Sequence, residues 1–175
     1  MSIPALPYFD KPPLLYFAHP VVGSAAGTPE EIEVVVQANL QRARRWLSFL
    51  FGVMPDAAFE MSWLNYIEIL PEGQATRERG LRDDELNASR CDGIVLCGGE
   101  LSSGMKREQA AVLQGCFDRG VKTLQIDLLS AGHEPPWTYD RASSARINLR
   151  GSHLHLTSND DIRRHLEHYS QWLSL

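Results

Sequence analysis

The sequence predicts an α/β fold in which an open, mostly parallel sheet is flanked by helices. Short apolar runs that suit buried strands recur along the chain, and segments with helix-capping residues or helical periodicity lie between them. The run DGIVLCG at 92–98 is almost continuously apolar, which is typical of a central strand in a parallel sheet. Strands that alternate with helices in this way favour parallel pairing.

The chain begins this pattern with an apolar, aromatic-rich strand at 14–18, LLYFA. A helix is expected over 29–51, because Thr28 precedes a proline at the first helical position and Glu31 stands three residues after the threonine, as in a capping box. The segment AAFEMSW at 57–63 predicts the second strand. These segments form the first strand–helix–strand unit of the expected sheet.

The middle of the chain supplies the other strands and helices. Residues 64–80 carry mixed signals and are interpreted as a loop with a short helical or strand piece, and 77–90 is expected to be helical. The next helix runs from 104 to 119 and stops at Gly120, an expected C-cap glycine, ahead of a strand at 121–127. This order suits a Rossmann-like or flavodoxin-like sheet, whose ligands bind beyond the carboxyl ends of the strands.

The length of the chain suits one domain. Residues 1–13 hold four prolines and are expected to be an extended or disordered lead-in, so that 14–175 forms a single α/β domain. Within it, 128–175 is expected to hold a loop, an edge strand at 153–158 and a last helix at 159–173.

Composition restricts the partners and the compartment. The 17 basic and 22 acidic residues give a net charge of −5, which argues against a nucleic-acid-binding face. No targeting leader or apolar run of membrane-spanning length is apparent, so we expect no membrane contact. An odd number of cysteines without Cys-x-x-Cys spacing predicts reduced, buried thiols and a cytoplasmic protein: Cys91, Cys97 and Cys116.

The stretch CGGELSSGMKREQ at 97–109 joins a strand to a helix and is the first candidate site. Gly99 and Gly104 have the spacing of a phosphate loop, but Met105 and Lys106 stand where that loop needs a lysine followed by serine or threonine. A nucleoside-triphosphate loop is therefore excluded.

The same stretch retains the parts of a cradle for an anion or a hydroxyl group. Ser102, Ser103 and Gly104 precede a helix whose first amides have no internal partners. Glu108 follows one turn later, where those donors are expected to keep its carboxylate ionised. An ionised carboxylate beside a sugar suits attack on an anomeric carbon with a covalent glycosyl intermediate. Alternatively, Glu108 only complements the helix N-terminus at the surface.

Four motifs in order, YFAHP, NLQRARRW, RDDELNASRCDGIVL and SSGMKRE, resemble the nucleoside 2-deoxyribosyltransferase family, which includes deoxynucleoside 5′-monophosphate N-glycosidases. The resemblance covers residues 14–127 and implies cleavage or transfer at the N-glycosidic bond of a nucleoside or nucleotide. It also implies that Glu108 is the nucleophile, that Asp84 assists at the base and sugar, and that Tyr16 lies near both the sugar and Glu108.

The resemblance also implies a set of substrate-binding positions. Ser102 takes the place that binds the 5′ end of the substrate, and further candidates surround it or follow the first strand: Ser103, Gly104, Met105, His19 and Gly23. The loop after that strand departs from the family, because HPVVG stands where phosphate-cleaving members have a Gly-Ser-x-Arg-Gly pattern. The missing arginine weakens the expectation of a 5′-phosphate.

Adjacent carboxylates at Asp83 and Asp84 point about 100° apart on a helix and cannot both face one site. The spacing match to the family implies that Asp84 faces the site and that Asp83 caps the helix or is solvated; without that resemblance, two surface carboxylates would be expected. Two histidine pairs lack the companion ligands of a zinc site, so no metal is expected: His153 with His155, and His165 with His168. Trp137 and Tyr139, in a late loop, are candidates to stack on a base.

The resemblance implies no cofactor and a homodimer or larger assembly whose subunits complete each other's sites. Two alternatives remain open. One is a non-catalytic nucleotide-binding module on the same fold. The other is a phosphoribohydrolase with the related PGGxGTxxE pattern, which is disfavoured because serine and methionine flank Gly104 where that pattern needs Gly-Thr.

Overall fold

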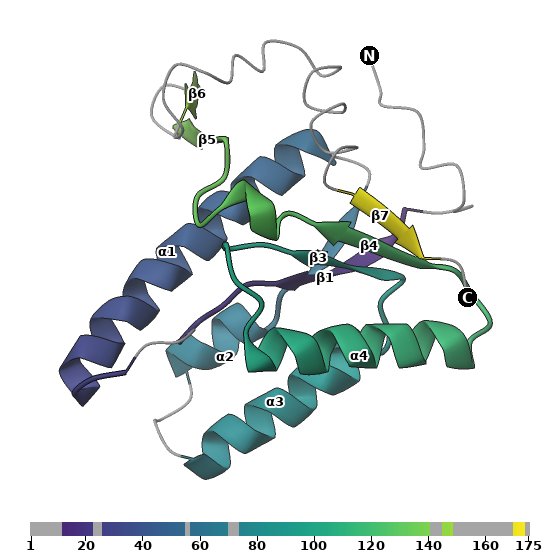
Figure 1. Ribbon diagram of the computed structural model, residues 1–175, viewed down its shortest axis with the longest axis horizontal. Coiled ribbons are helices and arrows are strands. Elements are labelled where there is room, and N and C mark those ends of the chain that lie inside the picture. The colour runs from purple at the N-terminus through teal and green to yellow at the C-terminus, as the bar shows by residue number, and fades with distance from the viewer. Residues whose placement is uncertain are drawn as a thin grey trace.

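The computed structural model describes residues 12–22, 26–54, 57–69, 74–140, 145–148 and 170–173. Its helices and strands alternate along the chain as expected for an α/β protein (Figure 1). They are β1 (Leu14–Ala18), α1 (Pro29–Val53), β2 (Ala58–Glu60), α2 (Trp63–Ile69), α3 (Gln74–Ala88), β3 (Gly93–Leu96), α4 (Ser103–Asp118), β4 (Thr123–Asp127), a 3-10 turn η1 (Leu129–Ala131), β5 (Trp137–Asp140), β6 (Ala145–Asn148) and β7 (Ser170–Leu173).

The main sheet has the strand order β2-β1-β3-β4-β7. Its first four strands are parallel, and β7 pairs antiparallel with β4 at the edge. This arrangement confirms the predicted open, mostly parallel sheet. Because the chain runs outward from β1 to β2 and then returns to β3 and β4, the topological switch point lies between β1 and β3.

Helices cover both faces of this sheet (Figure 1). The helices α3 and α4 lie side by side on one face, and α1 lies on the other, as right-handed crossovers require when the chain reverses direction. The capping box predicted at the start of α1 is present, with Thr28 and Glu31 each accepting from the other's backbone amide. The apolar side of α1 enters the core through Leu40, Ala43 and Leu47.

Close backbone contacts leave no room for a side chain at two positions of the fold, both of which are glycine. A side chain at Gly93 in β3 would overlap the carbonyl oxygen of Leu124, its partner in β4. A side chain at Gly115 in α4 would overlap the carbonyl oxygen of Ser89, just after α3. The second contact fixes how closely α3 and α4 approach each other.

Several predicted segments differ in the structure. Residues 64–80 contain the end of α2 and the start of α3, because Trp63 anchors α2 on β1 through an indole hydrogen bond to the Phe17 carbonyl at 2.7 Å. Residues 130–150 were expected to form a loop, but they include an antiparallel pair, β5 and β6.

The expected last helix at 159–173 is wrong at its end, where residues 170–173 form β7 and pair with the open edge of β4. The remainder of that helix lies outside the described residues, as do the edge strand expected at 153–158, residues 1–11 of the lead-in and the two histidine pairs. The side chains of Trp137 and Tyr139 are likewise outside the described part.

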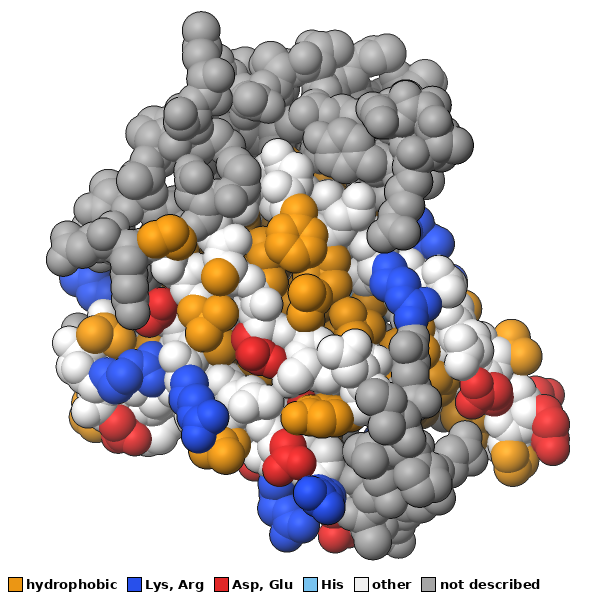
Figure 2. Space-filling model, turned by 180° about the vertical axis from the view of Figure 1, so that it is seen from behind, with side chains coloured by type: hydrophobic (Ala, Val, Ile, Leu, Met, Phe, Trp, Pro, Cys, Tyr) orange, Lys and Arg blue, Asp and Glu red, His pale blue; other side chains and the backbone are white. Residues whose placement is uncertain are grey.

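The face of the molecule turned away in Figure 1 has apolar side chains near its centre and mixed charges around them (Figure 2). Lys and Arg side chains alternate with Asp and Glu on this face, so no single basic patch forms on it. Across the helices that the structure describes, none has the length and hydrophobicity to cross a membrane.

Candidate active site

Tyr16 and Glu108 meet beside the switch point of the sheet. The Tyr16 hydroxyl donates a hydrogen bond to Glu108 Oε1 at 3.2 Å, and both side chains are buried. Tyr16 comes from β1, and Glu108 comes from α4, the helix that follows the neighbouring strand β3. Two residues 92 positions apart are thus joined at the place where open α/β sheets bind ligands.

The start of α4 explains why Glu108 points inward. Ser102 is the N-cap residue, and its hydroxyl accepts from the Met105 amide at 3.3 Å. Met105, Glu108, Val112 and Cys116 then recur every three or four residues and form the buried side of α4. The cap therefore sets the helical phase that turns the Glu108 carboxyl toward β1.

Asp84 reaches the same region from α3, which packs against α4. Its side chain is 8% exposed, and its Oδ1 atom has no hydrogen-bond partner among the described residues. Asp83 instead points outward and pairs with Arg79 at 3.8 Å. The two carboxylates separate as predicted, with Asp84 on the buried side.

Burial controls the protonation of these groups. Desolvation, together with the nearby charge of Asp84, raises the pKa of Glu108 to about 8, although the hydrogen bond from Tyr16 opposes the rise. Desolvation and then Asp83, Glu60 and Glu85 raise the pKa of Asp84 to about 7. Burial and the neighbouring carboxylates also raise the pKa of Tyr16 far above its usual range, so it remains a donor.

The expectation that helix amides would keep Glu108 ionised is therefore wrong for the free protein. Among the amides at the start of α4, that of Met105 donates to the Ser102 hydroxyl and that of Lys106 to the Ser102 carbonyl. Glu108 lies one turn further on, among acidic neighbours. Because the charge of Asp84 raises the pKa of Glu108, the two carboxyl groups titrate as a coupled pair, which loses its protons between about pH 7 and about pH 8.

Glu60 is a further acidic residue of this region that the sequence analysis did not single out. It ends β2, and its Cα is the register partner of Tyr16. Its position was detectable in principle, because it is a carboxylate near the end of a predicted parallel strand, where ligands gather. The site thus draws on the ends of two adjacent strands and on two helices.

The other candidates on α4 fall into different environments. Ser102 is half-buried, and Ser103 is exposed beside it. Met105 belongs to the hydrophobic core. Gly104 has open surroundings, because an added Cβ would come no nearer than 3.8 Å to Leu81.

His19 follows β1 but is not brought to Glu108. Its ring stacks on Phe17 at 6.2 Å, and strand alternation directs Phe17 away from the side that carries Tyr16. Burial lowers the pKa of His19 to about 4, so the ring is neutral at physiological pH. Gly23, the other candidate of this loop, lies outside the described residues.

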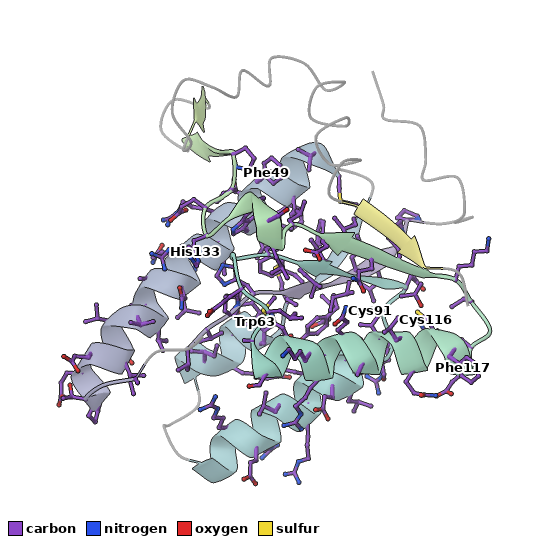
Figure 3. The ribbon with its side chains drawn as sticks, in the orientation of Figure 1. Phe49, Trp63, Cys91, Cys116, Phe117 and His133 are labelled. Carbon is purple, nitrogen blue, oxygen red and sulfur yellow. The ribbon has the colours of Figure 1, made fainter. Side chains whose placement is uncertain are left out.

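A second group of contacts holds the loops at the carboxyl edge. His133, labelled in Figure 3, lies in this group. Its ring hydrogen bonds to the Gly98 carbonyl at 2.9 Å, and the Trp46 indole donates to its carbonyl at 2.9 Å. Arg42 and Arg45 of α1 pair with Glu134. Sequence reasoning missed this group because its partners lie 35 to 92 residues apart.

The three cysteines are free and buried, as predicted. Cys116 lies close to Cys91 and donates to its carbonyl at 3.4 Å (Figure 3). Burial raises the pKa of the Cys91 thiol to about 12, so this cysteine is a packing residue. Within the described ranges, no cluster of three or more His, Cys, Asp or Glu side chains is arranged to hold a metal ion.

No protein-family model, curated protein or solved structure matches the chain. The resemblance to the nucleoside 2-deoxyribosyltransferase family therefore stays a prediction from the sequence motifs.

Proposed function

We propose that this protein cleaves or transfers the N-glycosidic bond of a nucleoside or nucleotide, with Glu108 as the nucleophile. The observation that supports this most is the buried hydrogen bond between Tyr16 and Glu108, with the buried Asp84 on the adjoining helix. These three residues come from separate segments of the chain. Their convergence beside the switch point fits a chemistry that needs two carboxyl groups with different tasks.

In the proposed reaction, the ionised Glu108 attacks C1′ of the sugar as the bond from C1′ to the base nitrogen breaks. Asp84 gives its proton to the departing base, and the transition state has oxocarbenium character. Water or a second base then displaces Glu108 from C1′, giving hydrolysis or transfer. The reaction starts from the form of the pair that has the proton on Asp84 and the charge on Glu108, and the hydrogen bond from Tyr16 stabilises that ionised carboxylate.

Ser102, Ser103 and the backbone at Gly104 are proposed to bind the sugar or its 5′ group. They lie at the start of α4, one turn before Glu108, where helix amides and hydroxyl groups favour oxygen-rich ligands. This set involves no cofactor. We further propose that the protein acts as a homodimer or larger assembly in the cytoplasm.

The alternative of a nucleotide-binding module that does no chemistry has one observation in its favour. A pKa of about 8 leaves Glu108 largely protonated at neutral pH in the free protein, and a protonated carboxyl group is a poor nucleophile. The same group can donate a hydrogen bond to a ligand. A binder of this kind keeps its affinity when Glu108 is replaced by glutamine.

The test is release of free base from ribonucleosides, deoxyribonucleosides and their 5′-monophosphates. Wild type is compared with Glu108→Gln and with Glu100→Gln, a matched change in the same strand-to-helix segment. We expect Glu108→Gln to lower kcat by about 10³-fold or more and Glu100→Gln to retain activity. If wild type releases no base from any compound yet is thermally stabilised by one of them, the binding module replaces the proposal.

A further inference from the structure

Glu60 is the acidic residue of this region that the proposed mechanism does not use. The parallel register of β1 and β2 pairs it with Tyr16, and register partners on adjacent strands project to the same side of a sheet. Tyr16 projects toward Glu108. Glu60 therefore stands on the side of the sheet that carries the Tyr16–Glu108 pair.

Two hydrogen bonds connect Glu60 to the helix that carries Asp84. The Ser62 backbone N–H donates to Glu60 Oε1 at 2.9 Å, and the Ser62 hydroxyl accepts from the Asn87 side-chain amide at 3.0 Å. Asn87 lies three residues after Asp84 and shares its side of α3. The end of β2, the turn into α2 and the helix α3 are thus held by one chain of hydrogen bonds.

The charges around Asp84 come from its own helix and from other elements of the site. On α3 itself, Asp83 and Glu85 are its neighbours. Asp83 pairs with Arg79, and Glu85 pairs with Arg107 of α4, so both charges are partly offset.

The other neighbours of Asp84 are Tyr16 from β1, Glu108 from α4 and Glu60 from β2. In the part of the chain that the structure describes, no cation forms an ion pair with Glu60. Its negative charge therefore acts on Asp84 without a compensating partner, and a like charge nearby disfavours loss of the Asp84 proton.

We infer that Glu60 is a positioning residue of this site, which keeps the proton on Asp84 and, through Ser62 and Asn87, holds α3 in place against the end of β2. The inference rests on the proposed function, in which Asp84 supplies that proton to the departing base. Glu60 itself touches no reacting atom in this scheme. It sets the pH range in which the pair of carboxyl groups is ready to react.

The experiment compares wild type with Glu60→Gln, Glu60→Asp and Ser62→Ala. Carboxyl-carbon NMR of the labelled protein without substrate follows the titration of Asp84, and base release gives kcat/KM against pH. Glu60→Gln is expected to move the Asp84 midpoint, and the limb of the pH profile that Asp84 sets, about one unit lower, because the like charge is gone. Glu60→Asp retains the charge and keeps both near their wild-type positions.

Ser62→Ala separates the hydrogen-bonded link from the charge, because it keeps the backbone N–H that binds Glu60. It is expected to lower kcat/KM by about 10-fold without moving the midpoint. The inference is overturned if the Asp84 midpoint is the same in Glu60→Gln and wild type, or if Ser62→Ala moves it equally. Should Glu60→Gln not fold, an unchanged kcat/KM in Ser62→Ala overturns the positioning role.

The two readouts keep this inference apart from the proposed function. If wild type releases no base, the proposed function is wrong. The NMR titration alone then decides whether Glu60 acts on Asp84. If wild type is active but its Asp84 midpoint equals that of Glu60→Gln, this inference is wrong and the proposed function stands.

Discussion

The most important single residues of the proposed site are two buried carboxyl groups, Glu108 and Asp84. Each lies where burial and neighbouring acids oppose its charge, which raises its pKa toward the neutral range. The Tyr16 hydroxyl contacts one of them and gives that carboxyl a donor for its ionised form. When two carboxyl groups lie in different environments, one can act as an acid and the other as a nucleophile or base at neutral pH.

The first prediction concerns the pH dependence of base release. The reactive form holds one proton on the pair, so activity rises as the first proton leaves and falls as the second one leaves. With pKa values of about 7 for Asp84 and about 8 for Glu108, we expect a bell-shaped kcat/KM profile with its maximum between them. A profile that is flat from acid to alkaline pH would contradict this pairing.

A second prediction concerns stability. In the unfolded chain Glu108 ionises near its usual pKa, but in the folded protein it stays protonated up to about pH 8. The wild type is therefore progressively destabilised as pH rises through this range, and the neutral variant Glu108→Gln escapes the effect. We expect Glu108→Gln to be more stable by about 4 kcal/mol at pH 8 and equal to wild type below the usual pKa of glutamate.

Urea unfolding at a series of pH values measures this difference. Asp83→Asn serves as the control, because Asp83 is half-exposed and pairs with Arg79 at the surface. If Glu108→Gln is no more stable than wild type at pH 8, the Glu108 carboxyl is ionised at little cost in the folded state.

At the scale of elements, the site depends on how closely α3 and α4 pack, because one carries Asp84 and the other Glu108. Gly115 allows the approach by leaving room for the Ser89 carbonyl. Arg119 reinforces it by donating to the carbonyl oxygens of Ser89 and Cys91. These groups lie at the far end of α4 from its N-cap, so they act on the site through the placement of whole helices.

The element-scale prediction is that Gly115→Ala destabilises the protein by about 3 kcal/mol and lowers base release, because the new methyl group must push α3 from α4. Gly80→Ala is the matched control on α3. No atom lies within 4 Å of the Cβ it would add, and alanine favours a helix, so it is expected to be neutral or slightly stabilising. Thermal unfolding of both variants compares them, and equal stabilities would show that the two helices are not in close contact.

At the scale of the whole molecule, the order of apolar runs and helix signals was sufficient to predict the open parallel sheet. Thr28 and Glu31 identified the start of α1, and Gly120 identified the end of α4. These are local signals, because caps and periodicity depend on neighbours in sequence. The separation of Asp83 from Asp84 followed from the same helical geometry.

Long-range contacts were beyond the sequence analysis. Residues 170–173 have no local feature that distinguishes a helix end from a strand, and only the open edge of β4 makes them a strand. The charge state of Glu108 was mispredicted because it depends on burial of the carboxyl group in the folded chain and on Asp84 across a helix interface. Glu60 was missed because its importance comes from its register with Tyr16.

The central claim is that Glu108 forms a covalent bond to the sugar, and mass spectrometry of the acid-quenched protein tests it most directly. The protein is mixed with each nucleoside that yields free base, quenched during turnover and digested. We predict a peptide containing Glu108 that is heavier by the mass of the sugar residue in wild type and unmodified in Glu108→Gln. Base release that continues in Glu108→Gln, with no sugar adduct on any peptide of wild type, would contradict the account.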